Sequence, residues 1–117
     1  MTIQELLDKL GWVPSNIKVR DSEGHYIYHS FGSDRGDYTN IYLSVMDDDD
    51  KLEVIETVED LISLLYNALY HGIMSGYKGG LFNITEDTVV TLGGWGYIGN
   101  EIVGLDCDNL VCVIAYK

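Results

Sequence analysis

The sequence predicts one α+β domain spanning residues 1–117, and two features of the chain lead to this fold class. Two segments carry apolar residues at helical spacing directly after a capping residue. Several shorter segments alternate polar and apolar residues or are rich in β-branched and aromatic residues, which is typical of strands. The expected order is a short N-terminal helix, a three-stranded antiparallel meander, one long core helix, and then about three further antiparallel strands.

A short amphipathic helix is predicted over residues 3–10. Thr2 and Glu5 match the capping box, in which the threonine caps the helix and the glutamate reaches back to the capping residue. Gly11 supplies a stop signal directly after the last apolar residue. The apolar residues at helical spacing are Ile3, Leu6, Leu7 and Leu10.

The three-stranded meander is predicted from residues 16–20, 25–31 and 38–46. The first and third segments alternate polar and apolar residues, and the second is rich in tyrosine and isoleucine. Turn residues separate the three segments, at 21–24 and at 32–36. Because short turns join neighbouring strands, we expect these strands to pair antiparallel in chain order.

The long core helix is predicted over residues 58–75. Thr57 and Asp60 form a second capping signal at its start, and Gly72 and Gly76 weaken its end. Its side chains are apolar on almost every side, so we expect it to be the central packing element of the domain. The residues that share one apolar face are Val58, Leu61, Ile62, Leu65, Leu69 and Ile73.

The last third of the chain predicts strands at residues 89–92, 101–105 and 110–116. The loop after the first of these strands contains a G-x-G-x-x-G match. The phosphate-binding version of this motif requires a following helix and a complete βαβ unit, and the remaining sequence provides neither. We interpret the loop as a glycine-rich turn that presents Trp95 and Tyr97, two aromatic side chains suited to a contact site.

The charge of the chain is strongly negative, with 19 acidic residues against 7 lysines and arginines and a formal net charge of -12. Such a field repels nucleic acid and anionic membrane surfaces, so we expect no direct binding to either. It favours a basic partner, a cation, or solubility alone. The N-terminus lacks the features of a secretory signal, and no apolar run approaches the roughly 20 residues of a membrane span, which predicts a cytoplasmic protein.

The carboxylates are densest between residues 47 and 60. The spacing of an EF-hand fails there, because the required glycine and glutamate positions are occupied by apolar residues. A solvated loop is the commoner reason for such a run, whereas a face that imitates the phosphates of nucleic acid is the functional alternative. The predicted partner-binding residues are Asp47, Asp48, Asp49, Asp50, Glu53 and Glu56 in this stretch, together with Trp95 and Tyr97.

No metal site, cofactor site or catalytic group is predicted. His25 and His29 share one face of a predicted strand, but zinc requires two more ligands of suitable geometry, so we interpret both as ordinary histidines. Asp106 and Asp108 flank Cys107 and would disfavour its thiolate, which is the nucleophilic form of the side chain. We therefore expect no enzymatic activity.

The two cysteines, Cys107 and Cys112, have a C-x4-C spacing. This spacing differs from the C-x-x-C of zinc knuckles and thioredoxin-type sites. On one short extended segment, the two side chains would point to opposite faces or lie too far apart to bond. We therefore predict two free thiols, buried as small apolar groups in a protein of a reducing compartment.

These features predict a small acidic binding or inhibitor protein of the anti-defence or immunity type. Such a protein would block a basic site on a nucleic-acid-acting protein, partly by imitating phosphate charge. The size, the acidity and the 9 tyrosines are similar to the general profile of anti-restriction, anti-CRISPR and toxin-immunity proteins, although no family motif is present.

Two alternatives stay open from the sequence. A small-molecule or nucleotide-binding protein that sequesters its ligand would use the glycine-rich aromatic loop as a pocket rim. This rim would combine the aromatic side chains with one cation from Arg20, Arg35 or Lys78. A homodimer is the second open point, because an edge strand at the C-terminus could pair with the same strand of another copy.

Overall fold

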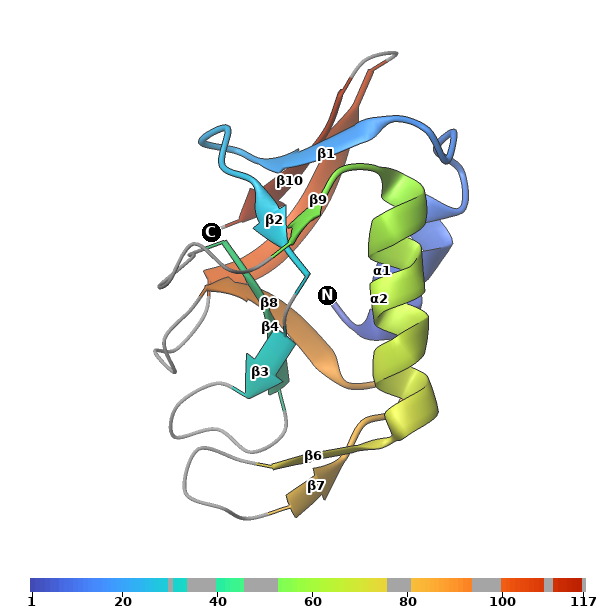
Figure 1. Ribbon diagram of the computed structural model, residues 1–117, viewed down its shortest axis with the longest axis vertical. Coiled ribbons are helices and arrows are strands. Elements are labelled where there is room, and N and C mark those ends of the chain that lie inside the picture. Colours follow the sequence, from blue (N-terminus) through green and yellow to red (C-terminus); the bar gives the residue numbers. More distant parts are fainter. Residues whose placement is uncertain are drawn as a thin grey trace.

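Two helices lie side by side against a six-stranded sheet in the computed structural model of the protein (Figure 1). The structure describes residues 1–29, 31–33, 40–45, 53–75, 81–93, 100–108 and 111–116. In chain order the described elements are α1 (Ile3–Leu10), β1 (Lys18–Asp21), β2 (Ile27–Tyr28), β3 (Phe31–Ser33), β4 (Asn40–Ser44), β5 (Val54–Ile55), α2 (Val58–His71), β6 (Ile73–Ser75), β7 (Leu81–Asn83), β8 (Val89–Gly93), β9 (Asn100–Cys107) and β10 (Val111–Tyr116).

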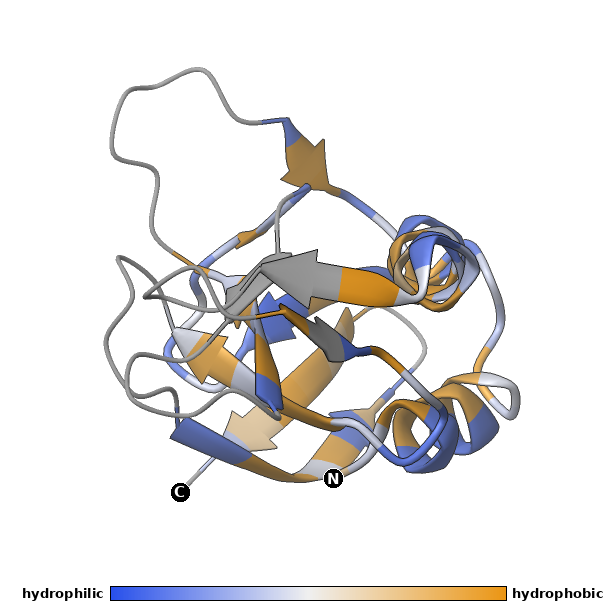
Figure 2. Cartoon of the chain, turned by 90° about the horizontal axis from the view of Figure 1, so that it is seen from below, coloured by the Kyte–Doolittle hydropathy of each residue, from blue (hydrophilic) through white to orange (hydrophobic). Residues whose placement is uncertain are grey.

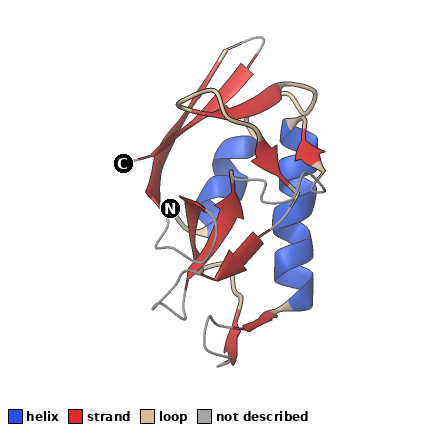
Figure 3. Cartoon of the chain, turned by 60° about the vertical axis from the view of Figure 1, so that its left-hand side comes forward, coloured by secondary structure: helices blue, strands red, loops and turns tan. Residues whose placement is uncertain are grey.

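The main sheet has the strand order β1-β10-β9-β8-β4-β3, and the pairs β2-β5 and β6-β7 form two smaller sheets. Figures 2 and 3 show the same arrangement from two other sides; in Figure 2 both helices lie beside one another at one side of the strands. The predicted mixture of helices with a strand-rich sheet is therefore confirmed. Neither of these helices is long and apolar enough to cross a membrane.

The hydrophobic core fills the space between the two helices and the sheet. Both helices and most strands of the main sheet contribute large aliphatic side chains that are fully buried. The largest of these side chains belong to Ile3, Leu6, Leu10, Ile27, Ile41, Leu43, Ile55, Leu61, Leu65, Leu92, Ile102 and Ile114.

Helix α1 has the bounds that the sequence predicts, and both hydrogen bonds of its capping box are formed. The Glu5 backbone N–H donates to Thr2 Oγ1 at 3.1 Å, and the Thr2 backbone N–H donates to Glu5 Oε1 at 3.0 Å. The four predicted apolar residues of α1 are all buried. Local sequence was sufficient here because the cap and the apolar stripe act within one helix.

Helix α2 begins where the sequence predicts but ends four residues earlier than the predicted position 75. Gly72 adopts a left-handed conformation with φ of 71°, and its N–H donates to the carbonyl oxygen of Ala68 at 3.1 Å. A left-handed glycine is a standard way to end a helix. Ile73, which the helical pattern placed on the apolar face, instead begins β6 and is 57% exposed.

The predicted three-stranded meander is wrong in its pairing. β1 pairs with β10 in parallel, and β2 pairs with β5 in a separate sheet. β4 pairs antiparallel with β3, which occupies part of the segment that was predicted to be a turn. β4 also pairs in parallel with β8, and α2 lies between them along the chain. Parallel pairing needs a long crossover connection, and the segment containing α2 supplies one.

The last third of the chain contains the predicted antiparallel strands, since β9 pairs antiparallel with both β8 and β10. The β6-β7 pair was not predicted from the sequence. The predicted C-terminal edge strand is a further correction: β10 lies between β1 and β9, so both of its edges are already paired. β10 therefore offers no unpaired edge to the same strand of a second copy.

Candidate functional site

Two of the predicted partner-binding residues, Glu53 and Glu56, lie in the described part of the chain. They flank the short strand β5, and both are exposed. The other predicted partner-binding residues lie outside the described residues; they are Asp47, Asp48, Asp49, Asp50, Trp95 and Tyr97. Among the described residues, the candidate site therefore lies on the segment that carries Glu53 and Glu56.

We call residues 53–60 the acidic segment, because they carry Glu53, Glu56, Glu59 and Asp60, all exposed. Backbone hydrogen bonds attach this segment to the strand β2 on one side and to the stretch before and within β1 on the other. The donor and acceptor pairs are His29 to Glu53 at 2.6 Å, Val19 to Glu56 at 3.2 Å, Val58 to Ile17 at 2.9 Å and Glu59 to Ser15 at 3.0 Å. These bonds cover the outer edge of β1 and hold the backbone that carries the carboxylates in one conformation.

The four carboxylates of the acidic segment differ in what they do for the fold. Asp60 forms the capping box of α2, in which the Thr57 N–H donates to Asp60 Oδ2 at 3.3 Å. The side chains of Glu53, Glu56 and Glu59 form no hydrogen bond or ion pair with a described residue. These three carboxylates are therefore exposed to solvent and make no stabilising side-chain contact with the described part of the chain.

Among the described residues, the carboxylates of the acidic segment form no ion pair with a lysine or arginine. Asp21 is buried, and every other Asp and Glu of the described ranges is exposed. Lys18 lies beside the segment, through a backbone bridge to Thr57, but no lysine or arginine forms an ion pair with a carboxylate among the described residues. The segment consequently presents four exposed carboxylates, with one exposed lysine beside them.

The buried carboxylate, Asp21, organises the turn between β1 and β2. Its Oδ1 accepts hydrogen bonds from the backbone N–H groups of Glu23 at 2.9 Å and of His25 at 2.7 Å. Its Oδ2 lies 2.9 Å from Nδ1 of His25, whose side chain is 55% exposed while that of Asp21 is 1% exposed. The sequence indicated a turn here, but not that the turn is built around a buried Asp-His pair.

The Asp-His pair and a nearby tyrosine have shifted titration. The hydrogen bond to Asp21, helped by its negative charge, raises the pKa of His25 above the usual value for a histidine. The parallel pairing of β1 with β10 brings Tyr116 to the same turn, where a hydrogen bond to the Glu23 carboxylate raises the pKa of the Tyr116 hydroxyl. Within the described residues, no group of three or more His, Cys, Asp or Glu side chains could hold a metal ion.

We expect His25 to titrate above the pKa of about 6.5 of an unperturbed histidine. In an Asp21→Asn variant, the pKa of His25 should fall back toward that value, because the negative charge of its partner is gone. Since the pKa is raised in the folded state, the Asp21-His25 interaction stabilises the fold fully below about pH 6.5, and this stabilisation is lost as pH rises through the folded-state pKa. NMR titration of the histidine ring measures both pKa values, and equal values in the two proteins would disprove the pairing.

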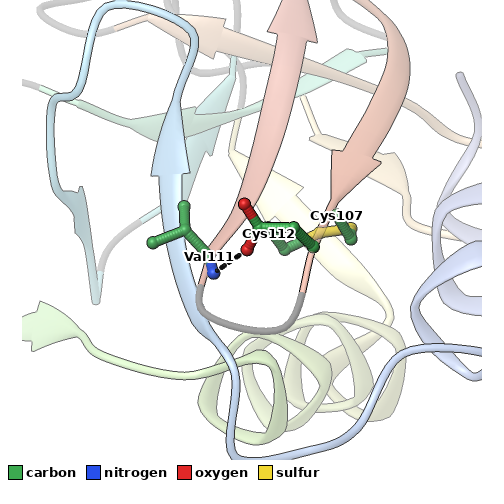
Figure 4. The surroundings of a disulfide bond; sticks show 4 residues. Cys107, Val111 and Cys112 are labelled. Atoms are coloured by element: carbon green, nitrogen blue, oxygen red, sulfur yellow. Dashed lines mark hydrogen bonds between the residues drawn. A yellow bond between two sulfur atoms is a disulfide. The ribbon is translucent and has the colours of Figure 1, made fainter.

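The prediction of two free cysteines is wrong, because a disulfide joins Cys107 to Cys112 (Figure 4). The two residues do not lie on one extended segment; they face each other across the β9-β10 hairpin, with Cα atoms 3.9 Å apart. The neighbouring pair is hydrogen-bonded, from the Asp108 N–H to the Val111 carbonyl oxygen at 3.0 Å. The cysteines therefore occupy a non-hydrogen-bonded pair, where side chains come closest.

The disulfide also bears on the predicted compartment. Disulfides persist mainly in oxidising environments, so the two cysteines no longer support a reducing compartment. A cytoplasmic location stays a prediction from the sequence.

The fold and the exposed segment together define an acidic domain of mixed α and β structure with a preformed anionic surface. Comparison with known protein families, with curated proteins and with solved structures found no significant match to the chain. The functional conclusion therefore depends on the residues themselves.

Proposed function

We propose that the protein is an acidic binding protein that occupies a basic surface on a partner protein. In its specific form, the proposal is an inhibitor of the anti-defence or immunity type, whose carboxylates take the place of nucleic-acid phosphates on a nucleic-acid-acting partner. The acidic segment supplies the contact, and Glu53, Glu56 and Glu59 are the described residues assigned to it.

One observation carries the proposal: three exposed carboxylates stand on a fixed backbone and have no partner among the described residues. Like charges placed close together repel one another and destabilise the compact state. Asp60 offsets this by capping α2, but the three glutamates provide no comparable stabilisation in the described structure. A cationic partner surface would supply the missing favourable interaction.

The rigidity of the acidic segment also favours binding. Its backbone bonds to β2 and to the β1 region are formed by the fold itself, so little backbone freedom is lost when a partner docks. Electrostatic complementarity of this kind mainly accelerates association and selects the partner.

The proposal predicts binding that weakens steeply with added salt. The range over which exposed charges act falls from about 10 Å at 0.1 M salt to about 3 Å at 1 M, so a charge-driven complex loses affinity across this range. The experiment is a titration of the protein against a panel of purified nucleases and nucleic-acid-binding proteins with basic grooves, at several salt concentrations. Competition by duplex DNA for the same groove tests the phosphate imitation directly.

A charge-matched pair of variants makes this test specific. We expect the double substitution Glu53→Gln with Glu56→Gln to weaken binding by about three- to tenfold, because two exposed charge contacts are removed. The control is Glu86→Gln with Asp87→Asn, which removes the same amount of charge outside the acidic segment. These residues lie at the N-terminal end of α1, where the Gln4 N–H donates to the Glu86 carbonyl oxygen at 3.0 Å. Equal weakening by both variants, or binding that ignores salt, would show that the acidic segment is not the contact surface.

A further inference from the structure

A pocket of about 390 Å³ lies between the C-terminal end of α1 and the strand β9. This volume falls within the range of about 300–1,000 Å³ that is typical of sites for small molecules. The described residues that line the pocket are Lys9, Trp12, Val13, Leu105 and Cys107. None of them belongs to the acidic segment, so the pocket is a feature separate from the proposed contact surface.

Both walls of the pocket are held by the fold. On the α1 side, the Trp12 N–H donates to the Lys9 carbonyl oxygen at 3.2 Å, and the Val13 N–H donates to that of Leu10 at 3.1 Å. On the β9 side, Leu105 and Cys107 lie two residues apart, so their side chains point to the same face of the strand. The disulfide ties this wall to β10. The fold therefore fixes the backbone on both sides of the pocket.

The indole of Trp12 is the most exposed large apolar side chain of the described residues, at 91%. Val13, Leu105 and Cys107, which line the same pocket, are partly buried and pack against the core. A tryptophan at the rim of an apolar hollow offers a large rigid surface to a flat or aliphatic ligand. This arrangement places apolar side chains and one indole at the pocket.

Lys9 gives the same pocket a positive charge. Two acids of α1 lie near it: Asp8 accepts from the Gln4 amide at 2.8 Å, and Glu5, which accepts from the Thr2 N–H at 3.0 Å, also interacts electrostatically with Lys9. Lys9 itself forms no ion pair with a described residue. In a chain with a net charge of -12, this pocket places one cation beside an apolar surface.

We propose that the pocket between α1 and β9 binds a small organic anion with an aromatic or aliphatic body. The apolar part of the ligand packs against Trp12, Val13 and Leu105, and its acidic group meets the ammonium group of Lys9. The proposal is independent of the partner-binding function, because it uses none of the residues of the acidic segment.

The test compares two fluorescent probes with the same aromatic body, anilinonaphthalene sulfonate and the uncharged phenylnaphthylamine. We expect Lys9→Gln to raise the Kd of the sulfonate by about two- to fivefold, as for an exposed charge pair, and to leave the Kd of the uncharged probe unchanged. Trp12→Ala should raise the Kd of both probes by about tenfold, because both stack on the indole. Both side chains are exposed, so these variants should unfold thermally at the wild-type temperature.

Two matched controls locate the binding. Tyr70→Ala removes an aromatic side chain that is 89% exposed at the end of α2, and Lys18→Gln removes an exposed lysine outside the pocket; both should leave each Kd unchanged. If Tyr70→Ala weakens binding and Trp12→Ala does not, the probes bind at the end of α2 and the proposal is overturned. Two outcomes would overturn the assignment of an anion to Lys9. One is that Lys9→Gln raises the Kd of both probes equally. The other is that Lys18→Gln raises the Kd of the sulfonate as much as Lys9→Gln does.

Discussion

Replacing Asp21 with alanine is expected to lower the free energy of unfolding by about 2–4 kcal/mol, since one buried carboxylate satisfies several donors at once. The backbone N–H groups of Glu23 and His25 both donate to Asp21 Oδ1, and the His25 ring pairs with Oδ2. Alanine leaves these two N–H groups without their acceptor in a partly buried turn. The effect should be the largest of any single change predicted for this protein.

Urea unfolding followed by circular dichroism measures this loss, and a matched variant controls for the removal of a negative charge. Asp87→Ala also deletes an aspartate, but the side chain of Asp87 is exposed and forms no hydrogen bond within the described structure. We expect this control to change stability by no more than about 0.5 kcal/mol. If Asp21→Ala is as mild as Asp87→Ala, the turn does not depend on the buried carboxylate.

The second large effect is expected from the disulfide of the β9-β10 hairpin. Cys107 and Cys112 close a loop with a sequence separation of 5 residues, and a loop of this length confines the unfolded chain enough to stabilise the fold by about 2 kcal/mol. Replacing both cysteines with alanine should remove this stabilisation. Alanine is preferable to serine, because Cys112 is fully buried and a hydroxyl there would lose its hydrogen bonds to water.

Chemical reduction provides an internal control for the cysteine variant. A reducing agent should bring the wild-type protein down to the stability of the double alanine variant and should leave that variant unaffected. A thiol assay on the unreduced, unfolded wild-type protein should detect no free thiol. Detection of two thiols per chain would show that the bond is not formed, and would restore the argument for a reducing compartment.

The helices were predictable because their signals are local. In α1, the cap at Thr2 and the apolar residues up to Leu10 lie within one continuous segment, and the predicted bounds hold. In α2, the apolar pattern continued through Ile73, but the left-handed conformation of Gly72 ended the helix first. A glycine inside an apolar run can either continue a helix or end it, and only the packing of the following chain decides which occurs.

The candidate sites were predictable only in part. Charge density alone identified Glu53 and Glu56 as exposed, because carboxylates without partners rarely become buried. The pocket residues Lys9 and Trp12 carried no such signal, since their partner wall is β9, which lies about 90 residues further along the chain. The pairing of Asp21 with His25 was equally hidden, because Asp in a turn is common whether or not it is buried.

The sequence by itself determined where both helices begin, where several of the longer strands lie, which side of α1 is apolar, and how negative the chain is. The tertiary structure decided which strands meet: β1 with β10, β4 with β8, and one cysteine with the other across a hairpin. The reason is that alternation of side chains specifies which face of a strand is buried, whereas its partner is selected by the packing of the whole core. Capping and periodicity act within a few residues, but strand order depends on contacts between segments that are distant in the chain.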